Sequence, residues 1–550
     1  MSDRGRQKQN EIKRGKASMS NNKNIGRKIH DRLSGWERIR VVLLGSKGTG
    51  KTVFMTSVGA QLRNHDKRAF DLGGWTVEFD PEEDDKVQDR VSKSDIQAFP
   101  YAESRALLAR GEWPKKTKDG CSVLTVPFTL KKVITRERMI LLQKLGFSET
   151  IKKRRRILLE MLDLPGERVA DFAMLGRSYR EWCTWMENRF GGILGSSESF
   201  RNFLNRVSAL GDSDSDKEKA VDFYKDFLAD ELSNLSLSIT PSTVKCKYNK
   251  CLYRDKCQYR DRCNERQYNS NKCLCPKEEL PKLTRDERLE LIREGLKEVP
   301  IGISEELQFI PLPKESFAKG SSHGGWVKPF AKAYEAYKKE IIMPIAAWCK
   351  HANSLLYFVD VLDLLRRGPE AYNTEKRFAE QALGFFKRHR ADNILMKPIK
   401  SLADQFVTHL DSVQIVATKT DCAGKQGNKM LSLAQKMLAS VVGRMGIDRV
   451  RFKSCAAVST SDIYTFKDKD TGEDRHAIRA RIKIGNNIKE EEFEVDKVPD
   501  DWPESAKWRQ DFNWQDTFPL FDKRDDVPPK QTDLDQIIQF VLAIPQTKEA

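Results

Sequence analysis

Hydrophobic residues gather in short runs along this chain, and longer segments of helical spacing separate the runs. Strand candidates lie at 39–44, 75–79, 122–130, 156–164, 354–362, 413–418 and 449–458. The last four are almost continuously apolar, which is typical of strands buried on both faces of a parallel sheet flanked by helices. After the first run, Val53, Phe54, Val58 and Leu62 recur at helical spacing. We therefore predict an α/β fold with a mostly parallel sheet.

Other patterns divide the chain into parts. Its start is basic and nearly free of aromatic residues, which favours a disordered arm. After about residue 170, amphipathic helical patterns replace the strand pattern until about residue 350. We predict, in chain order, an arm at 1–37, the first half of an α/β domain at 38–170, a helical insertion at 171–350, the second half of the domain at 351–465, and a β-hairpin with a closing helix at 466–550.

The sequence "GSKGTGKT" follows the first apolar run and fits G-x-x-x-x-G-K-[ST], the phosphate-binding P-loop. Its place between a strand pattern and a helix pattern makes the match specific. Backbone N–H groups at the helix start can surround a phosphate, Lys51 can reach the β- and γ-phosphates, and the Thr52 hydroxyl can ligate Mg²⁺. The candidate nucleotide-binding residues here are Gly45, Ser46, Lys47, Gly48, Thr49, Gly50, Lys51, Thr52 and Val53. We therefore predict a P-loop NTPase domain.

The apolar run at 156–164 supplies an acidic partner for this loop. Asp163 stands at its carboxyl end, and residues 163–166 fit D-x-x-G. P-loop proteins use such a carboxylate to hold Mg²⁺. The amide of Gly166 would then sense the γ-phosphate, and Glu167 occupies the position where Ras-like enzymes place a water-orienting glutamine. Glu167 is therefore a candidate catalytic residue, with a solvated acid at a helix start as the alternative.

The strand pattern at 413–418 runs into Thr418-Lys419-Thr420-Asp421, which fits [NT]-K-x-D. In GTPases this Asp accepts hydrogen bonds from guanine N1–H and N2–H₂, a donor pair that adenine lacks, and the Lys stem covers a face of the base. The next strand pattern ends near Ala456 and Ala457, where a backbone amide would contact guanine O6. We therefore predict GTP as the substrate and keep ATP as the alternative.

Several long strings carry a resemblance to a known family. They are "GSKGTGKTVFMTSV", "YAESRALLARGEWPKKT", "EMLDLPGERVADFAML", "AYEAYKKEIIMP", "YFVDVLDLLRRGPEAY", "VATKTD" and "CAAVST". With them, the chain resembles the YcjX-like family of bacterial P-loop NTPases from about residue 36 to 545. The resemblance implies a GTPase-like domain with a large helical insertion, a link to stress responses, and work beside a membrane protein. It also makes Thr117 a candidate switch threonine for Mg²⁺ and the γ-phosphate, with a surface-loop threonine as the alternative.

Charge and hydropathy bear on partners and location. The chain of 550 residues has a formal net charge of +17, which favours anionic partners such as nucleotides, acidic lipid surfaces or nucleic acid. We find no secretory h-region at the N-terminus and no run near the roughly 20 apolar residues that a spanning helix needs. We therefore expect a cytoplasmic location, with peripheral attachment to the inner membrane as an option.

Six of the 11 cysteines lie within 30 residues, and we name them the cysteine cluster. They are Cys246, Cys251, Cys257, Cys263, Cys273 and Cys275. Four thiolates could ligate Zn²⁺, and an iron–sulfur cluster is also open, although the spacing lacks the C-x-x-C of known zinc sites. Free thiols and disulfides are the alternatives, and interleaved Tyr, Arg and Lys residues also suit nucleic-acid contact.

These observations predict a Mg²⁺-dependent nucleoside triphosphatase that binds GTP and GDP and acts as a regulatory or stress-related switch. The candidate catalytic residues are Lys51, Thr117, Gly166 and Glu167, and the candidate Mg²⁺ ligands are Thr52, Thr117 and Asp163. The alternative function is a nucleic-acid or membrane-surface adaptor. In that case the basic arm and the cysteine cluster would make the contacts, and the nucleotide would be structural.

Overall fold

The computed structural model describes most of the chain between residues 35 and 544. The described ranges are 35–46, 48–66, 70–91, 96–115, 121–132, 153–190, 197–233, 240–244, 285–297, 299–386, 410–447, 449–467, 474–484, 487–508, 512, 514–520 and 527–544. The predictions for residues 1–34 of the arm, for Lys47, for Thr117 and for the cysteine cluster lie outside these ranges.

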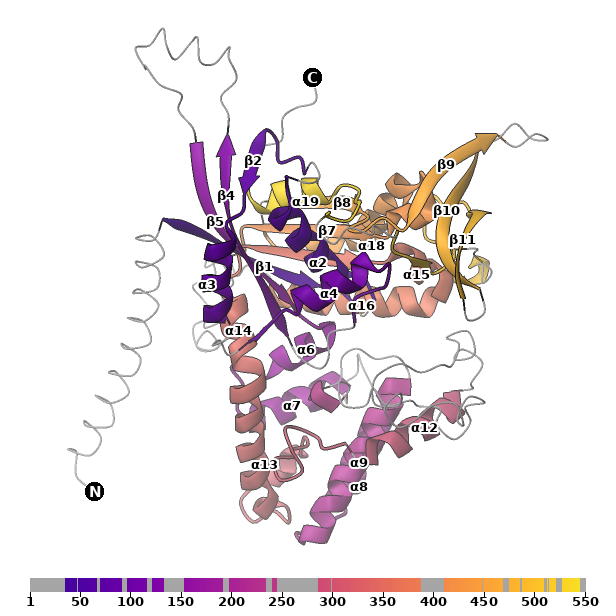
Figure 1. Ribbon diagram of the computed structural model, residues 1–550. Helices are drawn as coiled ribbons and strands as arrows, with labels where there is room; N and C mark the ends of the chain where they lie inside the picture. The colour runs from indigo at the N-terminus through magenta and orange to yellow at the C-terminus, as the bar shows by residue number, and fades with distance from the viewer. Residues whose placement is uncertain are drawn as a thin grey trace.

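The core of the fold is a mixed sheet in the order β2-β4-β5-β1-β6-β7-β8, with β3 paired to β4 (Figure 1). Its strands are β1 (Trp36–Leu44), β2 (Trp75–Glu78), β3 (Gln97–Ala98), β4 (Ser122–Lys132), β5 (Lys153–Asp163), β6 (Ser354–Val359), β7 (Ser412–Thr418) and β8 (Arg449–Cys455). β5, β1, β6, β7 and β8 are parallel, whereas β4 runs antiparallel to β5 and to β2. The predicted α/β class and mostly parallel sheet are confirmed.

Each face of the sheet has its own hydrophobic core, and the pleat of β1 supplies both. Val41 and Leu43 point into one core, while Val42 and Leu44 point into the other. The first core is covered by α2 (Lys51–Arg63) and α19 (Leu534–Val541), and the second by α16 (Pro369–Phe385) and α18 (Gly427–Gly443). Because both faces are covered, the central strands read as the continuous apolar runs seen in the sequence.

Shorter helices complete the periphery of the sheet. They are α3 (Pro81–Val91), α4 (Tyr101–Ala109), α15 (Val361–Arg367) and the turn η7 (Thr420–Ala423). α15 follows β6 and η7 follows β7, so both begin at the carboxyl edge of the parallel strands.

Helices make up most of the described chain between β5 and β6. They are α6 (Gly166–Asp171), η1 (Phe172–Met174), α7 (Tyr179–Phe190), α8 (Glu198–Ser208), α9 (Asp214–Ser233), α12 (Arg285–Lys297), η4 (Lys314–Phe317), α13 (Gly324–Tyr337), the π-helical turn η5 (Lys338–Ile342) and α14 (Met343–Cys349). Figure 1 shows α7, α8, α9, α12 and α13 gathered below the sheet. Trp182 and Tyr334 belong to the same hydrophobic cluster as Val42 and Leu44. The insertion is therefore packed onto the sheet, and its limits at 171–350 remain a prediction.

A second, antiparallel sheet follows the parallel one in the sequence. It consists of β9 (Ser461–Lys467), β10 (Asp474–Ile484), β11 (Asn487–Glu494) and β12 (Thr517–Phe518), with the turn η8 (Ser505–Lys507) between the last two. β10 and β11 form the hairpin that the sequence predicts. The pairing of β9 with β10 was not predicted, and it begins the second sheet before residue 466.

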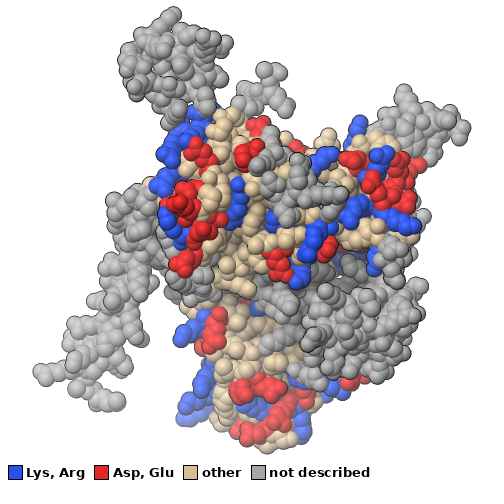
Figure 2. All heavy atoms as spheres, viewed as in Figure 1, with Lys and Arg blue, Asp and Glu red and all other residues tan. Residues whose placement is uncertain are grey.

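The surface carries both charge signs. On the face seen in Figure 2, Lys and Arg atoms lie interspersed with Asp and Glu atoms. The described residues also include ion pairs, such as Arg155 Nη2 with Glu37 Oε1 at 2.8 Å. No helix among the described residues is long and apolar enough to cross a bilayer.

A buried carboxylate ties α6 to the insertion. Asp171, the last residue of α6, is 1% exposed. Its Oδ1 accepts hydrogen bonds from Thr240 Oγ1 at 3.0 Å and Ser242 N at 2.8 Å. Its Oδ2 accepts from Ser242 Oγ at 2.5 Å and Tyr337 Oη at 2.6 Å. Four donors from two parts of the insertion thus meet one side chain.

Replacing Asp171 with alanine should destabilise the protein. The substitution leaves buried hydroxyl and amide donors without an acceptor, so we expect a loss of about 3 kcal/mol in the free energy of unfolding. Urea denaturation measures this loss. Asp222→Ala is the control, because that side chain is 70% exposed and its loss should change stability by less than about 0.5 kcal/mol. Equal stability of the two variants would contradict the assigned role of Asp171.

Candidate nucleotide-binding site

The loop after β1 contains three glycines at positive φ, the last of them Gly50 with φ 89°. Gly45 has φ 142° and Gly48 has φ 91°. A Cβ added to Gly45 would lie 2.6 Å from the carbonyl oxygen of Phe358 and 2.9 Å from Thr49 Oγ1. A Cβ added to Gly48 would meet nothing within 4 Å. Gly45 is therefore required by both packing and conformation, whereas Gly48 is favoured by conformation alone.

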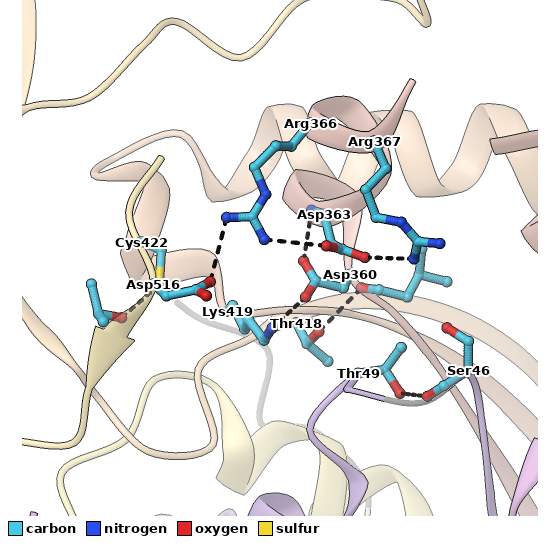
Figure 3. Close-up of polar contacts among 12 residues, drawn as sticks. Ser46, Thr49, Asp360, Asp363, Arg366, Arg367, Thr418, Lys419, Cys422 and Asp516 are labelled. Atoms are coloured by element: carbon cyan, nitrogen blue, oxygen red, sulfur yellow. Dashed lines mark hydrogen bonds and ion pairs between the residues drawn. The ribbon is translucent and has the colours of Figure 1, made fainter. Parts of the chain in front are cut away.

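The loop leads directly into the start of α2. Gly50 holds the N-cap position, no side chain caps the helix, and its first turn has no acidic residue. Lys51 Nζ donates to the carbonyl oxygens of Gly45 at 2.8 Å and Ser46 at 3.2 Å. Thr49 Oγ1 donates to Ser46 O at 2.9 Å (Figure 3). The ammonium and the positive end of the helix dipole thus face the same loop, an arrangement that suits a phosphate group.

Asp163 lies beside this loop because β5 pairs with β1. The register places Asp163 opposite Leu43, two residues before the loop glycine. Thr52 Oγ1 donates to Asp163 Oδ2 at 3.3 Å, and Asp163 is 3% exposed. A hydroxyl and a carboxylate are oxygen donors of the kind that Mg²⁺ prefers. These two residues therefore fit a Mg²⁺ ion that is completed by nucleotide phosphates and water.

The structure says less about the other residues that were predicted to bind metal or to take part in catalysis. Gly166 is the first residue of α6, and a Cβ added to it would lie 2.5 Å from the Phe378 ring of α16. The side chain of Glu167 is outside the described part of the structure, as are Thr117 and Lys47. Within the described ranges, no three His, Cys, Asp or Glu side chains gather as a metal site. The roles proposed for Glu167, Thr117 and the cysteine cluster remain predictions.

The [NT]-K-x-D motif at 418–421, the predicted base-reading motif, lies at the carboxyl end of β7, two strands from the phosphate loop. Thr418 Oγ1 donates to the carbonyl oxygen of Val359 at 3.2 Å, which joins the ends of β7 and β6. Lys419 follows in the left-handed region with φ 58°, and its ammonium forms an ion pair with Asp360 (Figure 3). Asp421 lies in the η7 turn and is 3% exposed.

The Asp421 carboxylate already has partners. Its Oδ2 accepts from Thr460 N at 2.6 Å and from Thr460 Oγ1 at 2.8 Å. Burial raises the pKa of the Asp421 carboxyl above its ordinary value, while the bonds from Thr460 lower it in part. Since each carboxylate oxygen offers about two acceptor positions, Oδ2 is saturated. Oδ1 has a distant contact with the Cys422 thiol at 4.0 Å, and the backbone amides of Asp421 and Ser461 also lower the pKa of this carboxyl.

Of the two alanines expected near guanine O6, one has an engaged amide. Ala456 N donates to Thr532 O at 3.1 Å, in an isolated bridge next to α19. Ala457 uses its carbonyl oxygen to accept from Ser57 Oγ at 2.5 Å. Ala457 is therefore the better placed of the two to offer an N–H group.

Most of these residues line one cavity of about 520 Å³. The predicted residues on its wall are Gly48, Gly50, Lys51, Thr52, Val53, Asp163, Thr418, Lys419, Asp421, Ala456 and Ala457. The remaining described candidates, Gly45, Ser46, Thr49 and Gly166, support the wall without lining it. The cavity thus extends from the phosphate loop to the base-reading motif.

Sequence reasoning missed several residues of the same wall. Asp360 and Arg366 come from the end of β6 and from α15, and Trp113 comes from the segment after α4. The segment 514–518 covers another side, where Thr517 O accepts from Trp113 Nε1 at 3.0 Å. Asp360 could have been found, because it ends an apolar strand run at the edge where Asp163 was found. Nothing in the local sequence of 514–518 indicates that it covers a cavity.

Glu375 of α16 is a further missed residue, buried behind the phosphate loop. It is 4% exposed, and its Oε1 accepts from Tyr357 Oη at 2.7 Å. Burial raises the pKa of the Glu375 carboxyl, while hydrogen bonds from Tyr357 and Ser46 lower it in part. Glu375 therefore links α16 to the loop through Ser46.

Comparison with known proteins identifies the family to which the chain belongs. The model of the YcjX-like family, DUF463, matches residues 39–242 and 291–543. The chain belongs to the YcjX-like family. A curated protein described as the Ras-like GTPase YcjX of Shewanella oneidensis strain MR-1 is 26% identical over 205 residues. That match covers 35% of this chain and 40% of the relative, so the chain matches less than half of the relative's length. The family assignment agrees with the resemblance seen in the sequence.

Alanine substitutions at Gly45 and Gly48 should lower the free energy of unfolding by different amounts. Gly45→Ala and Gly48→Ala both force an unfavourable φ, which costs roughly 1 to 3 kcal/mol. Only Gly45→Ala also drives a methyl group against a backbone carbonyl, which should add roughly 1 to 3 kcal/mol. Chemical denaturation of both variants measures the difference. A Gly45→Ala variant as stable as Gly48→Ala would contradict the loop geometry.

Proposed function

We propose that this YcjX-like protein binds GTP with Mg²⁺ and hydrolyses it to GDP. One observation carries the proposal: Lys51, Asp163 and Asp421 line a single cavity at the carboxyl ends of three strands of one sheet, β1, β5 and β7. The cavity volume of about 520 Å³ falls in the range of about 300 to 1,000 Å³ that is usual for small-molecule sites. The relative's description as a Ras-like GTPase supports the same function.

At the phosphate end, the chain would act by positioning and by charge. The loop amides and Lys51 would hold the β- and γ-phosphates, and Thr52 and Asp163 would hold Mg²⁺, Asp163 through water. When bound, Mg²⁺ neutralises the charge of the phosphate oxygens. Negative charge that develops in the transition state would meet groups that are already oriented. Thr117 and Glu167 remain candidates for the Mg²⁺ contact and for orienting water.

At the base end, Asp421 would select guanine. Oδ1 would accept one of the two guanine N–H groups. For the second bond, Thr460 Oγ1 must release Oδ2, while the Thr460 amide can keep its bond. Adenine offers no comparable donor pair, so ATP is the runner-up substrate. A preference for ATP would reassign Asp421 to a structural role.

The switch function that we propose rests on α6. This helix begins at Gly166, the residue expected to sense the γ-phosphate, and ends at Asp171, which the insertion surrounds with hydrogen bonds. A change at the γ-phosphate would therefore reach the insertion within the length of α6. A regulatory role in stress responses fits such a link.

Lys51→Ala should abolish hydrolysis and leave the fold intact. In the described part of the structure the Lys51 ammonium donates hydrogen bonds to loop carbonyls, and its removal should lower kcat by about 100-fold or more. Phosphate release from GTP measures activity, and circular dichroism checks the fold. Lys314→Ala, at a lysine 73% exposed in the insertion, is the control and should keep full activity. Retained hydrolysis in Lys51→Ala would overturn the role of the loop.

Asp421→Asn should shift base preference from GTP toward XTP. An amide can donate to the extra carbonyl of xanthine, so the ratio of affinities should change by at least about tenfold. Competitive binding of GTP, XTP and ATP to the variant measures the shift. Asp500→Asn, at a carboxylate 86% exposed, is the control. An unchanged preference for GTP would remove Asp421 from base recognition.

A further inference from the structure

Lys419 and Asp360 form an ion pair across two neighbouring strand ends (Figure 3). Asp360 follows β6, Lys419 follows β7, and both line the cavity. The Asp360 side chain is 8% exposed, and that of Lys419 is 44% exposed. The pair therefore lies at the cavity wall, with the carboxylate at its buried end.

Asp360 uses its two oxygens for different tasks. Oδ1 accepts from Asp363 N at 3.1 Å and so caps the N-terminus of α15. Oδ2 meets the Lys419 ammonium. The cap holds the carboxylate in one orientation, so the position of the Lys419 ammonium is fixed relative to α15.

The neighbouring charges are engaged with one another. Arg366 bonds Asp363 at 3.3 Å and Asp516 at 3.4 Å, and Arg367 bonds Asp363 at 3.1 Å. Burial would lower the pKa of Lys419, but the Asp360 carboxylate raises it above its ordinary value. Asp360 is therefore the carboxylate to which Lys419 binds.

The pair also fixes a side chain that would otherwise be mobile. A lysine side chain loses rotamer entropy when it is held in one conformation. The backbone of Lys419 is in the left-handed region, which is an unfavourable conformation for a residue other than glycine. With the ammonium tied to Asp360, the methylene stem is held along the wall next to Asp421. A flat base can pack on an apolar stem that is already ordered.

We propose that Asp360 is a positioning residue for the nucleotide base and acts through Lys419. The inference rests on the proposed function, because it needs a purine nucleotide in the cavity. The described contacts of the Asp360 side chain are with Asp363 and Lys419, and not with the phosphate loop or with the candidate metal ligands. Replacing Asp360 should therefore weaken binding of the base and not of the phosphates.

A double-mutant cycle tests this proposal. Asp360→Asn keeps the helix cap, because Asn and Asp cap equally well, but it loses the charge. Lys419→Met keeps a straight apolar stem without the ammonium. Asp80→Asn is the matched control: Asp80 Oδ1 caps α3 by accepting from Glu82 N at 3.0 Å, and Asp80 is not among the residues of the cavity wall. Affinities of each variant for GDP, for GTP and for Mg²⁺-tripolyphosphate, which has no base, are measured by calorimetry.

We expect Asp360→Asn and Lys419→Met each to weaken GDP and GTP binding by about 5- to 30-fold. The double variant should be no weaker than either single variant, and tripolyphosphate affinity should stay within about twofold in all of them. Asp80→Asn should match the parent protein throughout.

Other results would overturn the proposal. Additive losses in the double variant, equal losses for tripolyphosphate, or no loss of GDP affinity would each show that Asp360 does not position Lys419 for the base. If Asp360→Asn does not fold, the Lys419→Met variant decides the test. Its affinities for GDP and for tripolyphosphate are then compared. If the parent protein binds tripolyphosphate but neither purine nucleotide, the proposed function itself fails.

Discussion

Four neighbouring strands, β5, β1, β6 and β7, run in one direction, and the chemistry of the site depends on that alignment. Their pairing places Asp163 opposite Leu43, Tyr357 opposite Leu44, and Ala417 opposite Val359. Carboxyl ends of parallel strands meet at one edge of a sheet, and the sequence order reverses about β1. Residues hundreds of positions apart therefore share one cavity. A shift of one residue in any of these pairings would exchange the side chains of that strand between the two packed faces of the sheet.

The same edge connects the cavity to the rest of the molecule. α16 lies behind the phosphate loop, where Glu375 bonds Tyr357, and it also packs Phe378 against Gly166. α6 then runs from Gly166 to Asp171, which holds the insertion. The loop, the start of α6 and the insertion are thus joined by buried contacts. This arrangement gives a physical basis for a switch, because a small movement at Gly166 would meet tightly packed partners on both sides.

Much of this site could be predicted from sequence, because its main residues follow strand patterns directly. Gly45 to Thr52, Asp163 and Asp421 each come within a few residues of an apolar run, so a local pattern was enough. The partners of these residues come from distant segments and carry no such signal. Three examples depend on how the chain folds back. Thr460 donates hydrogen bonds to Asp421, Glu375 accepts one from Ser46, and the segment 514–518 covers one side of the cavity. The ion pair of Lys419 with Asp360 was likewise beyond reach, although each residue alone ends a strand run.

In the proposed complex, one nucleotide contacts the phosphate loop and Asp421 at the same time. Calorimetric titration of the purified protein with GTP and with ATP, each with Mg²⁺, measures whether such a complex forms. We expect saturable binding of one nucleotide per chain, with GTP bound more tightly than ATP. Absence of heat with both purine triphosphates, in protein that is folded by circular dichroism, would contradict it.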